Sequence, residues 1–234
     1  MKPVAIFRHS PGEGPGYFAT FLDSHCLPWQ LMRVDAGEPV PTDPGPFSGL
    51  AFMGGPMSVN DPLPWIAPVC ALIRAAMAAD IPVIGHCLGG QLMSKALGGV
   101  VTKNPVKEIG WGEVSVADSP AAKSWLPDVT NFLSFHWHGE TFSLPPGAEH
   151  LLSSQHCTHQ AFVLGKHLGM QCHVEMTADL IRLWNTQWAD EVSGSPGPGI
   201  QTPEQMTQDL DSRLAALNAT ASKLYTKWIE GLKT

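Results

Sequence analysis

The 234-residue sequence has few charged residues and no long hydrophobic run. Charged residues make up 15 % and hydrophobic residues 44 %, a balance that excludes a disordered chain and a coiled coil. No apolar stretch approaches the roughly 20 residues of a membrane-spanning helix, so no membrane partner is expected. The apolar stretch at residues 3–7 is short and is followed by charge, which predicts a first β-strand rather than a signal peptide.

Positive charge and paired cysteines are also scarce. The net charge is −7, so we expect no nucleic acid and no anionic membrane surface as a partner. The five cysteines are odd in number and contain no CxxC pair, which argues against a disulfide framework or a zinc ribbon and favours a cytoplasmic location. We expect four of them to be small buried hydrophobic residues: Cys26, Cys70, Cys157 and Cys172.

The first half of the sequence alternates short apolar strands with helices. β-Strands are predicted at residues 3–7, 29–34, 49–53 and 82–85, and helices at 65–79 and about 89–97. This alternation predicts an α/β fold with a mostly parallel central sheet flanked by helices. In such a fold the ligand site lies at the carboxyl ends of the strands.

The second half has closely spaced strands and then helices. We expect added antiparallel strands at one side of the same sheet, at residues 98–117, 132–136, 149–155, 159–165 and 168–173. Helices are predicted at 177–190 and 203–232, with a turn-rich loop at 193–203 and a cap at Thr202 or Thr207. The roughly 30 residues after that loop are too few for a second core, so one domain over residues 1–234 is predicted.

The final helix carries an apolar face formed by Leu210, Leu214, Leu217, Leu224 and Trp228. We expect this face to pack on the sheet, with a dimer interface as the alternative. The chain is therefore predicted to be a monomer or a homodimer.

Cys87 stands between an apolar strand and the start of a helix, in the sequence Val-Ile-Gly-His-Cys-Leu-Gly-Gly-Gln of residues 83–91. A sharp strand-to-helix turn of this kind exposes its side chain at the top of a sheet. The helix N-terminus carries partial positive charge, which favours a thiolate. We therefore predict that Cys87 is a covalent nucleophile.

A thiolate nucleophile needs a base, and the base needs a group that orients it. Among ten histidines, His173 ends an apolar strand and is followed by Val174 and Glu175. Residues i and i+2 of an extended segment point to the same side, so Glu175 can hold the His173 imidazole. The sequence thus predicts a Cys-His-Glu arrangement.

Attack on a carbonyl also requires fixed donors for the oxyanion. The backbone N–H of Leu88 is one candidate, and Gly54-Gly55 is the other because glycine lets a backbone approach closely. Gln91 lies one helical turn after Cys87, where its amide can contact a polar substrate.

Three of these motifs together, residues 85–91, Gly54-Gly55-Pro56 and His173-Val174-Glu175, resemble those of class I (triad-type) glutamine amidotransferases. The resemblance covers roughly residues 45–190 and is to stand-alone proteins similar to the glutaminase domain of GMP synthase. It implies a three-layer, flavodoxin-like fold. It also implies hydrolysis of the glutamine side-chain amide through a glutamyl-thioester, with ammonia passed to a synthetase partner and no cofactor.

Residue by residue, the resemblance makes Cys87 the nucleophile, His173 the general base and acid, and Glu175 the orienting acid. The implied oxyanion donors are Gly55 and Leu88, and the implied substrate contacts are Gly54, Gln91, His138 and Gly139. The last two match a Ser-His-Gly-Asp stretch whose backbone holds the amino-acid end of the substrate. The sequence departs from the family at Val174, which replaces a proline, and at Trp137, which replaces a smaller residue.

No metal site is predicted. His136-x-His138 and His156-x-x-His159 have the spacing of metal ligands, but neither pair has an acidic or cysteine partner at a fitting distance along the sequence.

Two other functions stay open. A γ-glutamyl peptidase would cleave γ-glutamyl amides with the same triad, and the Trp137 departure and the lack of a synthetase segment in the 234 residues favour it. A redox-sensitive binding module without turnover would also place a reactive thiol on such a turn, but it would not need His173 and Glu175.

Overall fold

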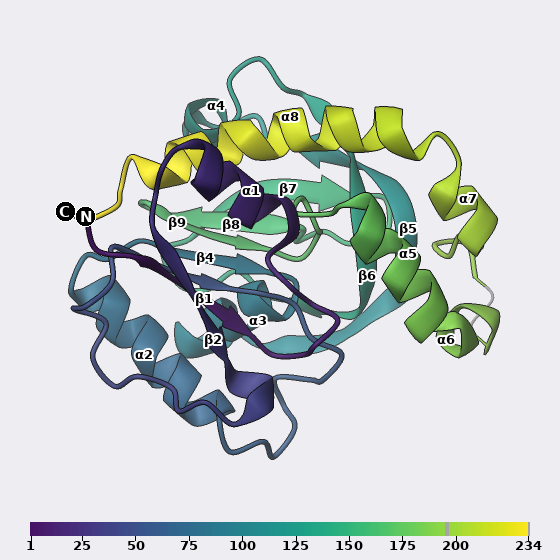
Figure 1. Cartoon of the computed structure of the whole chain (residues 1–234). Coiled ribbons are helices and arrows are strands. Elements are labelled where there is room, and N and C mark those ends of the chain that lie inside the picture. The colour runs from purple at the N-terminus through teal and green to yellow at the C-terminus, as the bar shows by residue number, and fades with distance from the viewer. Residues whose placement is uncertain (195–196, 234) are drawn as a thin grey trace.

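The computed structural model describes residues 1–194 and 197–233 of the chain. Within these residues, one sheet of nine strands runs through the molecule in the order β2-β1-β3-β4-β9-β8-β7-β5-β6. Helices cover both faces of the sheet (Figure 1). The predicted three-layer α/β fold is therefore confirmed.

The first five strands of that order are parallel: β2 (Trp29–Arg33), β1 (Val4–Arg8), β3 (Gly49–Phe52), β4 (Val83–His86) and β9 (His167–Met170). This is the flavodoxin-like order 2-1-3-4-5, with β9 in the fifth place. The direction of winding reverses between β1 and β3. Ligands bind in sheets of this kind outside the carboxyl ends of the strands at such a reversal.

The apolar sequence of β1 explains why this strand is buried on both faces. Val4 and Ile6 belong to the hydrophobic cluster on one side of the sheet, whereas Ala5 and Phe7 belong to the cluster on the other side. The first cluster includes residues of α1 (Gly16–Ser24), α5 (Ala178–Gln187) and α8 (Leu210–Ile229). The second includes residues of α2 (Ile66–Ala78) and α3 (Leu88–Ala96).

The direction of β9 was not predicted. Residues 168–173 are expected among the added antiparallel strands, but β9 pairs in parallel with β4 and is antiparallel only to β8 (Ala161–Leu164). This expectation is wrong because the direction of a pairing depends on which strand lies alongside, and composition does not reveal that.

The remaining strands form the antiparallel side of the sheet: β7 (Glu149–Ser154), β5 (Val101–Val116) and β6 (Asn131–Phe142). The expected strand at 132–136 is too short, since β6 continues to Phe142. His138 and Gly139 consequently lie within β6, and His138 stands opposite Glu108 of β5, next to a register shift.

The C-terminal helix is broken into two. α7 (Pro203–Thr207) and α8 are separated at Asp209, whose φ is 51°. Thr202 caps α7 by accepting the Gln205 backbone N–H, whereas Thr207 ends that helix and caps nothing. The apolar face of α8 is buried, so its predicted packing on the sheet is confirmed.

Shorter helices complete the described chain: α4 (Pro120–Trp125), α6 (Ala189–Gly194) and a 3-10 turn at Val34–Ala36. α6 occupies the start of the loop predicted at 193–203, and residues 195–196 of that loop lie outside the described residues. None of the helices in the described ranges is both long and apolar enough to span a bilayer.

All five cysteines lie in described segments and are free. Cys70, Cys157 and Cys172 are buried as expected. The expectation for Cys26 is wrong: this residue follows α1 at the surface, in a turn with φ of 53°.

Candidate active site

The carboxyl ends of β3, β4 and β9 bring several of the predicted site residues to one edge of the sheet. Gly54 and Gly55 follow β3, Cys87 follows β4 and His173 follows β9. A cavity of about 240 Å³ opens at this edge, and its lining includes Gly55, Cys87, Gln91, His138 and Gly139. The two motifs expected to share one rim of the sheet do so.

The backbone at Cys87 adopts a conformation that residues with side chains rarely take, with φ of 49° and ψ of −107°. The helix α3 begins at the next residue and packs very close to the sheet, since a Cβ on Gly89 would collide with the carbonyl oxygen of Phe52. This close packing holds the turn in its strained form. The Cys87 side chain is 6 % exposed and lines the cavity.

His173 and Glu175 form a buried pair beside Cys87. His173 Nδ1 lies 2.6 Å from Glu175 Oε1. The segment is fixed at both residues, because the His173 backbone N–H donates to the Phe135 carbonyl and the Glu175 carbonyl accepts the Tyr17 N–H, each at 2.8 Å. The polar side chains therefore have a rigid support although Val174 replaces the proline of the family pattern.

The electrostatics of this pair favour the protonated form of His173. Burial acts to lower the pKa of His173, but the Glu175 carboxylate and the Cys87 sulfur, with hydrogen bonds to both, raise it well above its usual value. Burial acts to raise the pKa of Glu175, and the charges of His173 and His86 outweigh it, so this pKa is lowered. Such a site can hold a proton on His173 and deliver it to a group at Cys87.

Gln171 is a neighbour of Cys87 that the sequence does not predict. Its Nε2 lies 3.5 Å from Cys87 Sγ, and its Oε1 accepts a hydrogen bond from Gln91 Nε2 at 3.1 Å. Gln91 lines the cavity, and its amide is already partly engaged by Gln171. Gln171 reaches Cys87 only because β9 lies parallel to β4, which explains why spacing along the sequence gives no sign of it.

The Gly54-Gly55 loop is enclosed from several sides. A Cβ on Gly54 would collide with Glu13 Oε2 and would lie 3.3 Å from His173 Cε1, so only glycine fits this close approach. His9 supports the start of the loop, with Nδ1 3.0 Å from the Met53 carbonyl oxygen. Burial lowers the pKa of His9 to about 4, so the ring is neutral and we assign the Nδ1 proton as the donor.

Glu13 is a second site residue that the sequence does not predict. It follows β1, is 6 % exposed and lines the cavity. Burial raises the pKa of Glu13 to about 7, with His173 acting to lower it and Glu175 to raise it. An acidic residue in a Gly- and Pro-rich loop directly after the first parallel strand is the signal that could have found it.

Tryptophans and an ion pair form another part of the cavity wall. Trp137 Nε1 donates to Glu191 Oε2 at 3.0 Å, and Glu191 pairs with Lys107 at 2.7 Å. The Trp137 and Trp188 rings lie with centroids 5.3 Å apart. Trp137, at which the sequence departs from the family, therefore links β6 to α6 and to Trp188, the residue that follows α5.

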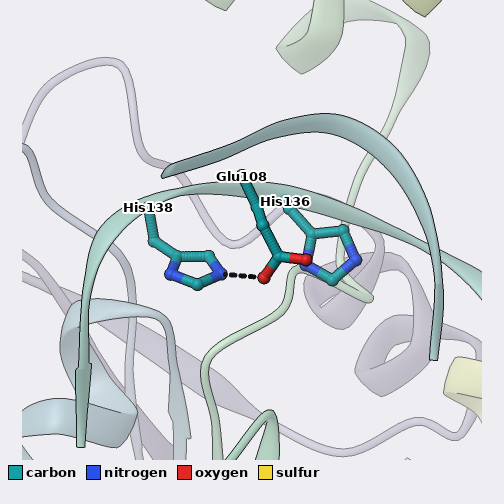
Figure 2. Close-up of side chains that lie close together, drawn as sticks. All are labelled: Glu108, His136 and His138. Carbon is teal, nitrogen blue, oxygen red and sulfur yellow. Dashed lines mark hydrogen bonds and ion pairs between the residues drawn. The ribbon is translucent and has the colours of Figure 1, made fainter. Parts of the chain in front are cut away.

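Glu108, His136 and His138 form a buried cluster next to the cavity (Figure 2). One potential ligand atom of each residue lies within 4.8 Å of the other two. His136 and His138 are expected to lack an acidic partner because none is near them in the sequence. The structure contradicts this expectation, because Glu108 lies opposite them on the neighbouring strand β5. Carboxylate and imidazole are residue types that bind transition metals.

Hydrogen bonds within the protein already occupy most of these atoms. Glu108 Oε2 lies 3.0 Å from His138 Nε2 and 2.7 Å from Gln160 Nε2, and Glu108 Oε1 accepts from Ser154 Oγ at 2.7 Å. His138 Nδ1 lies 2.9 Å from the Glu140 carbonyl oxygen. We therefore interpret the cluster as a hydrogen-bonded pair that braces β6 beside the cavity.

His136 is the exception within this cluster. Its Nδ1 is buried and has no hydrogen-bond partner among the described residues. Burial lowers the pKa of His136 to about 4, so its ring is neutral.

Comparison with known proteins gives matches along most of the chain. A family model described as glutamine amidotransferase class-I matches residues 27–181. The crystal structure of a glutamine amidotransferase from Methylobacillus flagellatus superimposes with a TM-score of 0.97 and 46 % identity, over 100 % of this chain and 96 % of that one.

Two curated relatives differ in what they are named for. A glutamine-hydrolyzing GMP synthase of Acinetobacter baylyi is 30 % identical over 182 residues, 74 % of this chain but only 30 % of that protein. γ-Glutamyl peptidase 3 of Arabidopsis thaliana is 25 % identical over 177 residues, 71 % of each chain. The resemblance predicted from the motifs is confirmed by these matches.

Proposed function

The chain belongs to the class-I glutamine amidotransferase family, and from this premise we propose that it hydrolyses the side-chain amide of glutamine. The observation that carries the proposal is the His173–Glu175 pair, 2.6 Å apart and beside Cys87 at the edge of the cavity. The reaction needs no cofactor. Glutamate and ammonia are its products.

In the proposed reaction the Cys87 sulfur attacks the amide carbon, and the backbone N–H groups of Gly55 and Leu88 receive the oxyanion. His173 holds the proton of the thiol and gives it to the leaving nitrogen. The C–N bond then breaks, ammonia departs and a glutamyl-thioester remains on Cys87. Glu175 keeps the imidazole oriented and stabilises its charge.

Water completes the cycle. His173 takes a proton from a water molecule that attacks the thioester carbon, the C–S bond breaks, and the proton returns to the Cys87 sulfur. Glutamate leaves with the new oxygen. Of the groups used, Cys87 and Gly55 line the cavity, and His173 interacts with the Cys87 sulfur.

We assign the amino-acid end of the substrate to the backbone of His138 and Gly139, and the side-chain amide to the neighbourhood of Gly54 and Gln91. The Glu108–His138 hydrogen bond supports this assignment, because it fixes the side chain of His138 behind the cavity wall. A synthetase partner that accepts the ammonia is also part of the proposal. The matched GMP synthase is more than three times as long as the region it shares with this chain.

A γ-glutamyl peptidase is the second candidate. The match to the Arabidopsis peptidase extends over 71 % of each chain, and the cavity continues from Cys87 to Trp137, Trp188 and Glu191, where an amine larger than ammonia could lie. A redox-sensitive binding module is less well supported, because it has no use for the buried His173–Glu175 pair.

Release of glutamate from a panel of substrates tests the proposal. The purified chain should release glutamate from L-glutamine, slowly when no partner is present, and Cys87→Ala should abolish the release. Unchanged release by Cys87→Ala would overturn the proposal. Turnover of γ-glutamyl peptides without turnover of glutamine would replace it with the second candidate.

A further inference from the structure

Glu13 is a buried carboxyl at the cavity to which the proposed reaction gives no role. Its side chain lines the cavity together with Cys87 and Gly55, and the residue is only 6 % exposed. Among the described residues it forms no side-chain hydrogen bond and no ion pair. Burial penalises the charge of this carboxylate, and a hydrogen-bonding or cationic group of a ligand in the cavity would offset that penalty.

The position of the carboxylate relative to His173 is set by Gly54. Because a Cβ on Gly54 would meet both Glu13 Oε2 and His173 Cε1, the carboxylate and the imidazole edge lie on the same side of this loop. Cε1 stands between the two ring nitrogens. Nδ1 is bound to Glu175, so Nε2 is the nitrogen that exchanges a proton at Cys87.

The geometry of amide attack decides which part of a substrate meets Glu13. The carbonyl oxygen points to the N–H groups of Gly55 and Leu88, and the leaving nitrogen must point to His173, which protonates it. The amino-acid end is assigned to β6, which forms a different wall of the cavity. The group nearest to Glu13 is therefore the leaving nitrogen.

We propose that Glu13 is a further catalytic residue, whose carboxylate accepts a hydrogen bond from the leaving nitrogen as His173 protonates it. This inference rests on the proposed amide hydrolysis. The proton moves from His173 Nε2 to the nitrogen, the C–N bond breaks and its electron pair stays on the nitrogen. Glu13 exchanges no proton and stabilises the positive charge that develops there.

A consequence follows for the kind of leaving group. An amide nitrogen carries N–H groups and becomes cationic before it leaves, whereas an ester oxygen has no N–H and leaves without forming an ammonium group. Glu13 should therefore accelerate the cleavage of γ-glutamyl amides and contribute little to the cleavage of γ-glutamyl esters. A residue that merely shaped the cavity would affect both substrates alike.

The test compares L-glutamine with L-glutamic acid γ-methyl ester in wild-type protein and in Glu13→Gln. The quantity to measure is kcat/KM, because it reports the steps up to the thioester, and the hydrolysis of the thioester is common to both substrates. We expect kcat/KM to fall about 100-fold for glutamine and less than about threefold for the ester, the loss typical of one preorganised electrostatic contact. Glu13→Asp, which keeps the charge, should recover part of the activity on glutamine.

Glu113→Gln is the control, since Glu113 is an exposed glutamate of β5 and the substitution removes the same charge. It should leave the ratio of amide to ester activity unchanged. An equal fall on both substrates in Glu13→Gln, or no fall on glutamine, would overturn the role of Glu13. If the wild-type protein cleaves neither substrate, the proposed hydrolysis itself fails, which is a different result.

Discussion

His173 Nδ1 lies 2.6 Å from Glu175 Oε1, and the two side chains belong to residues only two positions apart. Val174 between them is fully buried in the hydrophobic cluster that also contains Ile181 and Trp184 of α5. The chain bends between β9 and α5, and in this bent segment one side chain enters the core while the polar side chains of His173 and Glu175 meet each other. The position of the His173–Glu175 pair therefore depends on the packing of Val174 in the hydrophobic cluster on this side of the sheet.

Glu175→Gln tests the electrostatic part of this relationship. The substitution keeps the size of the side chain and removes the charge that holds the pKa of His173 well above its usual value. We expect kcat/KM for glutamine to fall by about 10²- to 10⁴-fold with the fold intact. Glu113→Gln, at an exposed position of β5, is the control. A loss smaller than tenfold would show that Glu175 does not orient the base.

Gly89→Ala tests the close packing that holds Cys87 in its strained turn. The added Cβ would meet the backbone carbonyl of Phe52, which cannot rotate away. We expect the free energy of unfolding to fall by about 1–3 kcal/mol, measured by urea denaturation, together with a loss of activity. Gly14→Ala is the matched control, because a Cβ there has nothing within 4 Å. Equal stability of the two variants would contradict this account.

The raised pKa of Glu13 predicts how stability changes with pH. Its folded-state value of about 7 lies above the value of 4.5 expected for an unfolded chain, so the folded protein keeps this proton between those pH values. The contribution of Glu13 is therefore most favourable below pH 4.5 and is lost as the pH rises through 7, by up to about 3 kcal/mol.

Glu13→Gln removes this dependence. Urea unfolding at both pH values gives the difference in free energy of unfolding between the variant and wild type. This difference should favour the variant more at pH 8 than at pH 4. A difference in stability that does not change between pH 4 and pH 8 would show that Glu13 ionises without a penalty.

From the hydrogen bonds of Glu108 and His138 we predict that the stability of the protein does not depend on a bound metal. Both Glu108 oxygens and both His138 nitrogens have protein groups within 3.0 Å, so treatment with a chelator should leave Tm unchanged. Glu108→Ala should cost about 1–3 kcal/mol, because it leaves a buried ring nitrogen of His138 without its hydrogen-bond partner. A Tm that falls with the chelator and recovers with zinc would instead identify a metal site.

The residues that the sequence could identify are those whose roles depend on near neighbours. The strand-to-helix turn at Cys87 is visible within nine residues of sequence, and Glu175 is only two residues from His173, although that segment is bent and not the end of a strand. The parallel strands of the first half were also predictable, since each is a short apolar run bounded by turns or helices.

Residues that reach the site through strand pairing could not be identified in this way. Gln171 contacts Cys87 because β9 inserts beside β4, and Glu108 meets His138 across a register shift between β5 and β6. Glu13 approaches His173 because the segments after β1 and β9 both pack against Gly54, which follows β3. The single domain over residues 1–234, the cytoplasmic location and the oligomeric state stay predictions.

Covalent labelling by a diazo-ketone analogue of glutamine tests the central claim most directly. Peptide mass spectrometry should find the adduct on Cys87, with labelling slowed by excess glutamine and by His173→Gln. Cys26 is an internal control, because it is exposed and simple alkylation would reach it first. Selective modification of Cys87 is the predicted result, whereas labelling of Cys26 with Cys87 unmodified would contradict the assignment of Cys87 as the nucleophile.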